Sequence, residues 1–345
     1  MKILGIETSC DECAAAIVED GRTILSNVIA TQIPFHAEYN GVVPEIASRK
    51  HTEWIYNIVN EAFVQAHLSV SDIDGVAATA NPGLLGSLLV GLTFAKTFAW
   101  ARRIPFIACN HILAHLYAAQ LCNNHLCNDN LKYPFLGLLV SGGHTIICRA
   151  LDFDNIEILG TTIDDAAGEA FDKVSKHFQM GYPGGKYIDG LAKSGDSDVF
   201  SFPLPNLHKG GHRCDVSYSG LKTAVINQTE QFRKKGTPGI IPLPDLAASF
   251  QKTAVEILLR ALFNAVEDSG IKTVVAGGGV AANSYLRERL AEKKELNCIF
   301  PPPELCGDNG AMVAGIGFKY LERGEQSPLC VTASARVKGF KRKYP

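Results

Sequence analysis

The first half of the chain alternates between two spacings of apolar residues. Two long segments, 44–66 and 84–101, have the length and the apolar pattern of helices. Two short and mainly apolar segments, 73–79 and 104–109, are predicted to be strands. The alternation of helices with buried strands predicts an α/β fold.

The second half is predicted to be mainly helical until a glycine-rich turn. Its helices are expected at 167–178, 220–232 and 243–268. A strand at 272–276 then meets three glycines at 277–279, and a further helix is expected from Ala281. The segment 195–215 is rich in Gly, Pro, Ser and His without periodicity, which predicts an exposed functional loop.

A strand–turn–strand unit occurs once in each half. An apolar strand at 3–9 ends in small hydroxyl residues and is followed by a second apolar run at 14–18. The segment 135–143 repeats this plan and leads into a strand at 145–149. The repetition predicts a duplicated α/β domain, with a chance likeness of two buried strands as the alternative.

Length and composition bound the architecture. The chain has 345 residues, of which 46% are hydrophobic and 20% charged, so it can form two lobes that each have a core. We expect a first lobe at 1–133, completed by the C-terminal helix and tail at 308–345, and a second lobe at 134–307. The net charge of −2 gives no global sign of nucleic-acid binding, so any such surface must be local.

The beginning of the chain and its cysteines predict a cytoplasmic protein. The first residues run directly into a strand without the layout of a signal peptide, and no apolar span is long enough to cross a membrane. The ten cysteines are therefore expected to be reduced. Cys10 and Cys13 form a C-x-x-C pair, and Cys122, His125 and Cys127 cluster in a polar loop. Neither group has a second pair at zinc-finger spacing, which favours free thiols.

Two histidines one helical turn apart are the most informative polar pair. Residues four apart share a helix face, so His111 and His115 can direct both imidazoles at one ion. Far downstream, the isolated acid Asp308 lies in a turn that leads into an apolar helix. Two histidines and one carboxylate suffice for a catalytic divalent metal with positions left open for a substrate. A histidine pair at this spacing more often packs in the core or lies on the surface than binds a metal. The interpretation as a metal site therefore depends on the other motifs.

Two glycine-rich turns follow predicted strands. At Ser141, Gly142 and Gly143, backbone N–H groups can wrap an anion, with a tight hairpin turn as the alternative. The segment 277–283 is a strand–glycine–helix transition that suits a nucleotide against a helix N-terminus. The chain has neither the G-x-G-x-x-G spacing nor a G-x-x-x-x-G-K-[ST] loop, which disfavours the Rossmann and P-loop readings.

Acidic residues accompany these turns. Asp172 lies a turn or more inside its helix, where a cap is not needed, and suits a role as acceptor from sugar hydroxyls. Gly185 begins another helix and shares a face with Asp189.

Three more acids, Glu7, Asp11 and Glu12, lie in and just after the turn that follows the first strand. The alternative is that these acids simply lie on a solvent-exposed hairpin, which is a reasonable explanation for one acid but a weaker one for three. Lys222 lies in the first turn of a helix, against the helix dipole, which hints at a nearby anion, with a plain surface lysine as the alternative.

Eight segments, in this order, resemble one known family. They are ETSCDE (7–12), GVVPEIASRKH (41–51), NPGLLGSLLVG (81–91), LVSGGHT (139–145), IDDAAGEAFDK (163–173), YPGG (182–185), SGLKT (219–223) and GDNGAM (307–312). Together they are similar to the tRNA threonylcarbamoyladenosine transferase (TsaD) family, once labelled O-sialoglycoprotein endopeptidase. The resemblance covers nearly the whole chain. Its departures are Leu113 and Ala114 inside the histidine motif, Cys13, a Cys-rich insertion at 122–130 and a basic tail.

The resemblance implies the two-lobed, actin-like fold of sugar kinases, Hsp70 and actin, with a duplicated α/β domain. It implies transfer of the threonylcarbamoyl group from threonylcarbamoyl-AMP to the N6 amine of adenosine-37, with release of AMP, in tRNAs that read codons beginning with A. It further implies one divalent metal at His111, His115 and Asp308, usually Fe²⁺, with Zn²⁺ or Mg²⁺ as alternatives. The implied acyl-adenylate site consists of Leu139, Val140, Ser141, Gly142, Gly143, Asp172, Gly185, Asp189 and Asn283. Asp11 or Glu12 is our hypothesis for the group that handles the amine proton or orients the ligand.

The family also implies partners. Besides tRNA, these are a smaller non-catalytic paralogue (TsaB-like), an ATPase partner (TsaE-like) and an adenylate-forming enzyme (TsaC-like). Three alternatives stay open: a small-molecule kinase or ATPase of the same fold, a metal-dependent endopeptidase, and a non-catalytic interaction module. The endopeptidase would need H-E-x-x-H, whereas residue 112 is Ile. The interaction module would be expected to lack the metal triad.

Affinity for tRNA must come from local cations because the net charge is near zero. The candidates are His208, Lys209, His212, Arg213, Lys222, Arg233, Lys234, Lys235, Arg336, Lys338, Lys341, Arg342 and Lys343. The tail has no acid and no apolar pattern with which to pack, so we expect it to contribute. An inert solubilising tail is the alternative.

Overall fold

Two compact units make up the chain. The computed structural model describes residues 1–39, 41–121, 131–205, 207, 212–234, 241–336 and 341–342. The first unit contains 1–133, 152–155 and 301–340, and the second contains 134–151, 156–300 and 341–345. Residues 301–307 thus group with the first unit, whereas the sequence-based division assigns them to the second lobe. That division remains a prediction.

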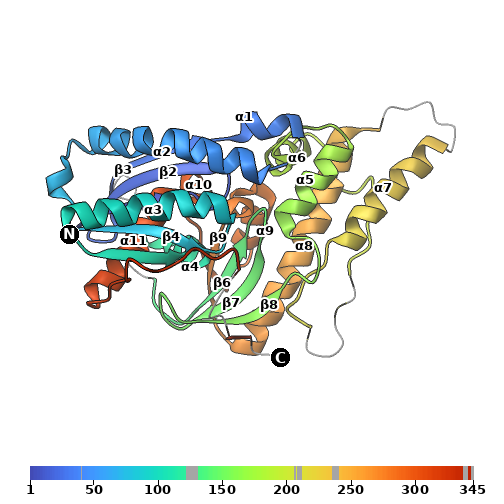
Figure 1. Cartoon of the computed structure of the whole chain (residues 1–345). Coiled ribbons are helices and arrows are strands. Elements are labelled where there is room, and N and C mark those ends of the chain that lie inside the picture. The colour runs from blue at the N-terminus through green and yellow to red at the C-terminus, as the bar shows by residue number, and fades with distance from the viewer. Residues whose placement is uncertain are drawn as a thin grey trace. The chain divides into compact units, whose positions relative to one another are not determined.

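A five-stranded sheet forms the centre of the first unit (Figure 1). Its strands are β1 (Lys2–Glu7), β2 (Glu12–Glu19), β3 (Thr23–Thr31), β4 (Gly75–Asn81) and β5 (Phe106–Asn110). Their order is β3-β2-β1-β4-β5, with β2 antiparallel to both β1 and β3, and with β4 and β5 parallel to β1. The strands β1, β2 and β4 are buried almost along their whole length, as expected where both faces of a sheet are covered.

Helices cover both faces of this sheet. Alternate side chains of a strand point to opposite faces, and Leu4 and Ile6 belong to the core formed with the long helices α2 (Pro44–Ala66) and α3 (Leu85–Arg102). Gly5, between them, faces α11 (Gly310–Glu322) on the other side. The shorter helices of this unit are α1 (Ile33–His36), α4 (His111–Tyr117) and α10 (Pro303–Cys306).

The helix α11 lies unusually close to the sheet because both surfaces carry glycine. A Cβ atom at Gly5 would lie 2.2 Å from the carbonyl oxygen of Gly310. A Cβ atom at Gly310 would lie 2.5 Å from the backbone nitrogen of Ala16. Real side chains do not make such contacts, so the absence of side chains at these positions sets the distance between α11 and the sheet. This contact also fixes the loop that precedes α11.

The second unit repeats the strand arrangement of the first. Its strands are β6 (Phe135–Val140), β7 (Thr145–Ala150), β8 (Ile156–Thr161), β9 (Thr273–Gly277), β10 (Asn297–Ile299) and β11 (Lys341–Arg342). The order is β10-β9-β6-β7-β8-β11, with an antiparallel β6-β7-β8 meander and β9 parallel to β6. Apart from β11, which runs parallel to β8, this is the order of the first sheet. The predicted duplication of an α/β domain is confirmed.

Five α-helices accompany the second sheet in the described part of the chain. They are α5 (Ala167–His177), α6 (Gly184–Ala192), α7 (Ser219–Lys234), α8 (Leu243–Ser269) and α9 (Ser284–Ala291). The buried helix α8 packs against α6, and its Phe250 ring meets Phe171 of α5 edge to face at 5.0 Å. Among the described residues, no helix combines the length and the apolar composition that a membrane crossing requires.

The elements with strong periodicity agree with their sequence predictions, and several short or weak ones were missed, among them the strands β3, β8 and β10 and the one-turn helices α1 and α10. The predicted helix 44–66 is α2, and both predicted hairpins are present. The strands β3 and β8 were not predicted, because β3 in particular mixes buried, half-buried and exposed positions without a clean alternation. The helix predicted from Ala281 is present, but its start was predicted three residues too early. A 3₁₀ turn occupies Gly279–Ala282, and α9 begins only at Ser284, where Asn283 caps it.

Candidate functional site

The helix α4 presents two histidines to one point in the first unit. It begins directly after β5, and the side-chain oxygen of Asn110 accepts from the backbone nitrogens of Ile112 and Leu113, which caps the helix. His111 is therefore the first helical residue, and His115 lies one turn later on the same face. Both rings are buried, and they meet edge to face at 4.5 Å between centroids.

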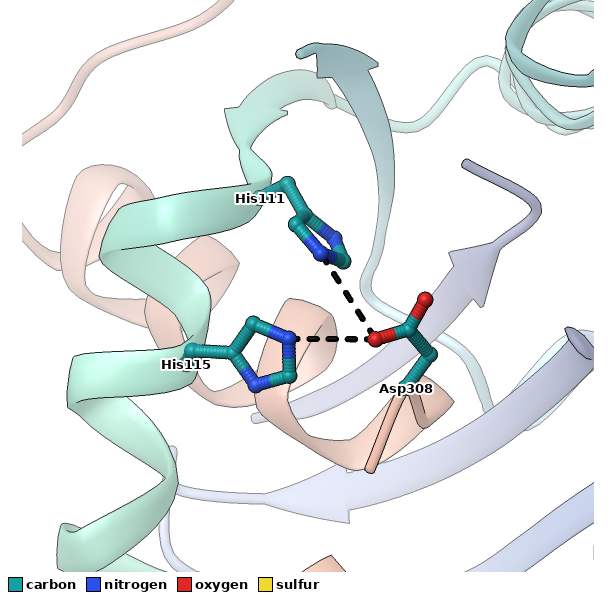
Figure 2. A group of neighbouring side chains, drawn as sticks. All are labelled: His111, His115 and Asp308. Carbon is teal, nitrogen blue, oxygen red and sulfur yellow. Dashed lines mark hydrogen bonds and ion pairs between the residues drawn. The ribbon is translucent and has the colours of Figure 1, made fainter. Parts of the chain in front are cut away.

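A carboxylate from the far end of the chain completes the group. Asp308 lies in the short loop between α10 and α11, where Asn309 accepts from the backbone nitrogen of Met312 and caps α11. Its Oδ1 lies 3.1 Å from Nε2 of His115 and 3.6 Å from Nε2 of His111 (Figure 2). The ligand atoms of His111, His115 and Asp308 all lie within 4.8 Å of one another.

This donor set fits a divalent transition metal. Ligand atoms about 2.1 Å from a metal lie roughly 3 to 3.5 Å from one another. The two distances from Asp308 Oδ1 to the histidine nitrogens, 3.1 and 3.6 Å, are close to this spacing. Two imidazoles and one carboxylate are typical ligands of iron and zinc and leave coordination positions open. The three residues that the sequence predicted as ligands are thus brought together, although they lie on separate elements.

The charges around His111 favour a positive charge on its ring. Burial by itself would lower the pKa of His111, but Asp308 and Glu7 raise it to about 9. Glu7 is fully buried, and its Oε2 lies 3.0 Å from Nδ1 of His111. Burial raises the pKa of Glu7, yet the charge and the hydrogen bond of His111 bring it below the ordinary value. In the sequence, Glu7 is one of three neighbouring acids, and nothing in its local pattern indicates the contact with His111.

The two candidate proton-handling acids lie at the start of β2. Burial, together with the charges of Asp11 and Asp308, raises the pKa of Glu12 well above its ordinary value. The hydroxyl of Thr31 donates to Glu12 at 3.3 Å. The backbone oxygen of Asp11 accepts from the nitrogen of Gln32. The environment of Glu12 thus favours its protonated form.

The predicted adenylate residues all belong to the second unit, and the first of them form a turn. The hairpin turn after β6 is closed by a hydrogen bond from the Ser141 nitrogen to the His144 oxygen at 2.8 Å. The Ser141 hydroxyl accepts from the His144 nitrogen at 3.1 Å. The amide of Ser141 is therefore engaged within the turn. Gly142 and Gly143 are exposed, and a Cβ atom at either would meet nothing within 4 Å.

Contacts join the remaining predicted residues to this turn. The Gly168 nitrogen of α5 donates to the Ser141 oxygen, and Asp172, one turn later, accepts from the Gly184 nitrogen of α6 at 2.7 Å. Asp189 of α6 accepts from the nitrogen and the hydroxyl of Ser284 in α9 at 3.0 and 2.7 Å.

Further contacts lead from α9 back to β6, the strand that precedes the turn 141–143. Asn283 precedes α9, and its side-chain amide donates to Gln251 at 2.9 Å. Gly278, at the end of β9, has a φ of +87°, and a Cβ atom there would lie 2.4 Å from the Val140 oxygen. The turn 141–143, α5, α6 and α9 therefore form a connected ring that contains or borders every predicted adenylate residue. Gly185 is in the first turn of α6, where a Cβ atom would meet nothing within 4 Å.

Several predicted tRNA-binding cations are already paired with acids. Lys222 contacts Asp165 at 2.9 Å, so the anion that its position predicted is a residue of the chain itself. Arg213 contacts Asp268 at 2.8 Å and also pairs with Glu267. His212 contacts Asp215 at 2.7 Å. These pairs weaken the case for phosphate contacts at the three positions.

Other positions singled out in the sequence lie outside the residues whose side chains are described. They are Cys122, His125, Cys127, the whole insertion 122–130, His208, Lys209, Arg233, Lys234, Lys235, Lys338, Lys341, Arg342 and Lys343. Cys10 and Cys13 are free thiols among the described cysteines, in agreement with the expectation of reduced cysteines. Burial raises the pKa of Cys13 to about 12, which makes it an inert core residue.

The sequence matches a known family over most of its length. Residues 23–315 match the model of TsaD, tRNA N6-adenosine threonylcarbamoyltransferase. A protein of that name from Treponema denticola is 64% identical over 99% of both chains. A homologue of the same name from Treponema pallidum (strain Nichols) is 55% identical, and the match covers 99% of this chain and 95% of the homologue. Another from Borreliella burgdorferi (strain B31) is 49% identical, and the match covers 100% of this chain and 96% of the homologue.

Solved structures show a likeness of fold. Component A of the (R)-2-hydroxyglutaryl-CoA dehydratase of Acidaminococcus fermentans matches with a TM-score of 0.55 at 14% identity, covering 93% of this chain and 99% of its own. Full-length HypF, in a phosphate- and nucleotide-bound form, matches with a TM-score of 0.57 at 15% identity, covering 94% of this chain and 47% of its own. The predicted actin-like architecture with a duplicated domain is confirmed by these folds and by the repeated strand order.

Proposed function

The chain belongs to the family of tRNA N6-adenosine threonylcarbamoyltransferases, and from this premise we propose how its residues carry out that reaction. The chain transfers a threonylcarbamoyl group to the N6 amine of adenosine-37 in tRNAs that read codons beginning with A. The proposed donor is threonylcarbamoyl-AMP, with AMP as the leaving group. The observation that carries the function is 64% identity over 99% of both chains to a protein of this name.

We propose that His111, His115 and Asp308 hold one divalent metal, with Fe²⁺ as the first choice and Zn²⁺ or Mg²⁺ as alternatives. The support is the donor set with its two buried histidines, the spacing of its atoms and the two carboxylates that favour positive charge at His111. When bound, such a metal supplies a Lewis acid that grips carbonyl or phosphate oxygens. The buried Ile112 takes the place of the glutamate that an H-E-x-x-H endopeptidase needs, so the old endopeptidase label is disfavoured.

The chemical difficulty lies in the acceptor. The lone pair of an adenine amine is delocalised into the ring, so the amine is a poor nucleophile and needs an activated donor. A mixed anhydride with AMP provides such a donor, because the phosphate leaves as a stable anion. The protein has to orient the anhydride, stabilise the departing phosphate and accept a proton from the amine.

Residues of the second unit are proposed to bind the adenylate. The exposed amides of Gly142 and Gly143 are the proposed donors to the phosphate, since the Ser141 amide is engaged within its turn. Leu139 and Val140 lead into this turn, and Gly185 leaves room for a ligand beside α6. The sugar and the base are proposed to be bound by Asp172, Asp189 and Asn283. Each of these side chains can form further hydrogen bonds besides those that it makes within the protein.

We propose Glu12, rather than Asp11, as the acid that handles the amine proton. A raised pKa makes the ionised form of Glu12 a stronger base than an ordinary carboxylate, so the group can accept a proton from the amine once it is ionised.

The function is tested by mass analysis of tRNA nucleosides after depletion of the gene in its host. Complementation with the intact chain is expected to restore threonylcarbamoyladenosine. A complemented strain without the modified nucleoside would rule the function out. The proposed partners besides tRNA are the TsaB-like paralogue, the TsaE-like ATPase and the TsaC-like adenylate-forming enzyme, and the proposed location is the cytoplasm. These proposals rest on the family.

Asp172 offers a test of the adenylate site. Asp172→Asn keeps an oxygen that accepts from the Gly184 nitrogen but loses the charge, so the link from α5 to α6 is preserved. We expect the affinity for AMP to fall about tenfold in this variant, because a hydrogen bond to a charged group contributes roughly 1.5 to 3 kcal/mol. Calorimetric titration with AMP measures this effect. Asp172→Ala should lose the same affinity and also some stability. Normal AMP binding by Asp172→Asn would show that the residue serves only to join the two helices.

The basic tail offers a test of tRNA binding. Replacing Lys338, Lys341, Arg342 and Lys343 with Gln is expected to weaken tRNA binding and to make it less dependent on salt. The slope of log affinity against log salt concentration should become shallower by about 0.7 to 0.9 for each phosphate that the tail no longer neutralises. Salt titrations of tRNA binding provide the measurement. The substitution is preferable to truncation because residues 341–342 form β11 beside β8. Superimposable titrations for both proteins would make the tail inert and leave the loop at 195–215 as the main candidate.

A further inference from the structure

Glu7 is a fully buried carboxylate whose position neither the fold nor the proposed ligand set explains. It is the last residue of β1, and its side chain has no exposed surface. A charged group in such a place is costly unless each of its oxygens is hydrogen-bonded. It is also absent from the group of residues whose donor atoms converge on a metal position. Its contacts therefore indicate what it does.

Three groups surround the carboxylate, and two of them must donate. The backbone nitrogen of Ser9 donates to Oε1 at 2.5 Å, and the hydroxyl of Thr79 in β4 donates to Oε2 at 2.6 Å. The third is Nδ1 of His111, at 3.0 Å from Oε2. An ionised carboxylate can only accept, so its contact with Nδ1 of His111 requires a proton on that nitrogen. The hydroxyl of Ser9 lies 3.2 Å from the same nitrogen and is compatible with this proton, because a hydroxyl can accept as well as donate.

The proton on Nδ1 decides what the other nitrogen can do. In a neutral imidazole with Nδ1 protonated, Nε2 keeps a free lone pair, and Nε2 is the atom of His111 that faces Asp308. His115 has no such support, since its Nδ1 is buried without a hydrogen-bond partner in the described part of the chain. The two histidines of the pair are thus held in different ways.

We propose that Glu7 is a positioning residue that fixes His111 in the Nδ1-protonated form and so presents Nε2 as a ready metal ligand. A carboxylate behind a metal-bound histidine also makes the ring a stronger ligand. This proposal rests on the metal site proposed above and adds to it a residue outside the ligand set. Thr79 and Ser9 hold the carboxylate in place from β4 and from the turn after β1.

The substitution Glu7→Gln provides a sharp test because it reverses the pattern of donors. The backbone nitrogen of Ser9 can only donate, so the amide oxygen of Gln must face it. The amide NH₂ then faces His111 and Thr79, whose hydroxyl can turn to accept. Facing this NH₂, Nδ1 of His111 is expected to accept, and the Ser9 hydroxyl, 3.2 Å away, can turn to donate to it as well. The ring proton then moves to Nε2 and removes the lone pair from the metal position. Side-chain volume is almost unchanged.

The matched control is Thr79→Val. It removes one hydrogen bond to Glu7 at nearly constant volume but leaves the carboxylate and its contact with His111. If Glu7 only stabilises the end of β1, both substitutions should lower stability and neither should alter the histidine. If Glu7 positions His111, only Glu7→Gln should do so.

The experiment combines two readouts on the full chain. In metal-free protein with ¹⁵N-labelled histidine, at about pH 10 where an imidazole is neutral, NMR is expected to show His111 protonated at Nδ1 in the wild type and in Thr79→Val, and at Nε2 in Glu7→Gln. Titration with Zn²⁺ is expected to show a 10- to 100-fold weaker affinity in Glu7→Gln alone.

The outcomes separate this proposal from the one on which it rests. Wild-type protein with His111 protonated at Nε2 would overturn the role of Glu7 even if the Gln variant failed to fold. Unchanged Zn²⁺ affinity in a folded Glu7→Gln variant would overturn it as well. A His115→Ala variant that binds Zn²⁺ as tightly as the wild type would instead contradict the metal site itself.

Discussion

The double substitution His111→Ala/His115→Ala is expected to abolish metal binding and to lower transferase activity by more than about 100-fold. Removing a carboxylate that only hydrogen-bonds to a metal ligand lowers metal affinity or activity about 10- to 100-fold. Removing two of the ligands themselves should therefore have a larger effect. The reason is geometric, because the two Nε2 atoms and Asp308 Oδ1 surround one position in the first unit. Elemental analysis of purified protein measures the metal, and single-turnover transfer to tRNA measures the activity.

The matched control for this prediction is His177→Ala. His177 is exposed at the end of α5, so its loss should leave both the metal and the activity unchanged. Because the two substitutions at buried positions also remove packing, denaturant unfolding of metal-free proteins should accompany the measurement. Stoichiometric metal in the folded double variant would show that the ion, if bound, lies elsewhere.

Gly310→Ala is expected to destabilise the first unit by about 3 kcal/mol or more, at the upper end of what overpacking of a core costs. The added Cβ atom would lie 2.5 Å from the backbone nitrogen of Ala16, so α11 has to move away from the sheet. Asp308 lies two residues before this helix, and we expect its displacement to weaken metal binding in the protein that still folds. Urea unfolding and Zn²⁺ titration measure the two effects.

Gly307→Ala is the control for this substitution. It lies on the other side of Asp308, with a φ of −76°, and a Cβ atom there meets nothing within 4 Å. Its stability should therefore stay close to that of the wild type. Equal stability of the Gly310 and Gly307 variants would mean that the close approach of α11 to the sheet is not required for the fold.

The sequence alone determined the elements that have a strong pattern. A helix at 44–66 follows from its length and periodicity, and the duplicated domain follows from two strand–turn–strand segments that resemble each other. The spacing of His111 and His115 places them on one helix face, since this is a property of any α-helix. Patterns of this kind are local, so they can be recognised in the sequence without information on which elements pack against one another.

Patterns without a strong local signal could not be resolved in this way. The edge strand β3 alternates poorly because it is only partly covered. The start of α9 depends on the cap that Asn283 provides and on a glycine with positive φ before the preceding 3₁₀ turn, so the apolar pattern placed it three residues too early. Lys222 hinted at an anion, but only the fold shows that Asp165 is that anion.

The tertiary structure alone decided how distant residues meet. Asp308 is 193 residues from His115 in the chain, and only the packing of α11 against β1 brings the two within 3.1 Å. Glu7 is one of several acids in its segment, and its meaning comes from burial and from contacts with Thr79 and His111. The sequence determines which residue types are available and how neighbours along the chain are spaced. The protonation and orientation of a buried group depend on the donors around it, and these come from elements that only folding brings together.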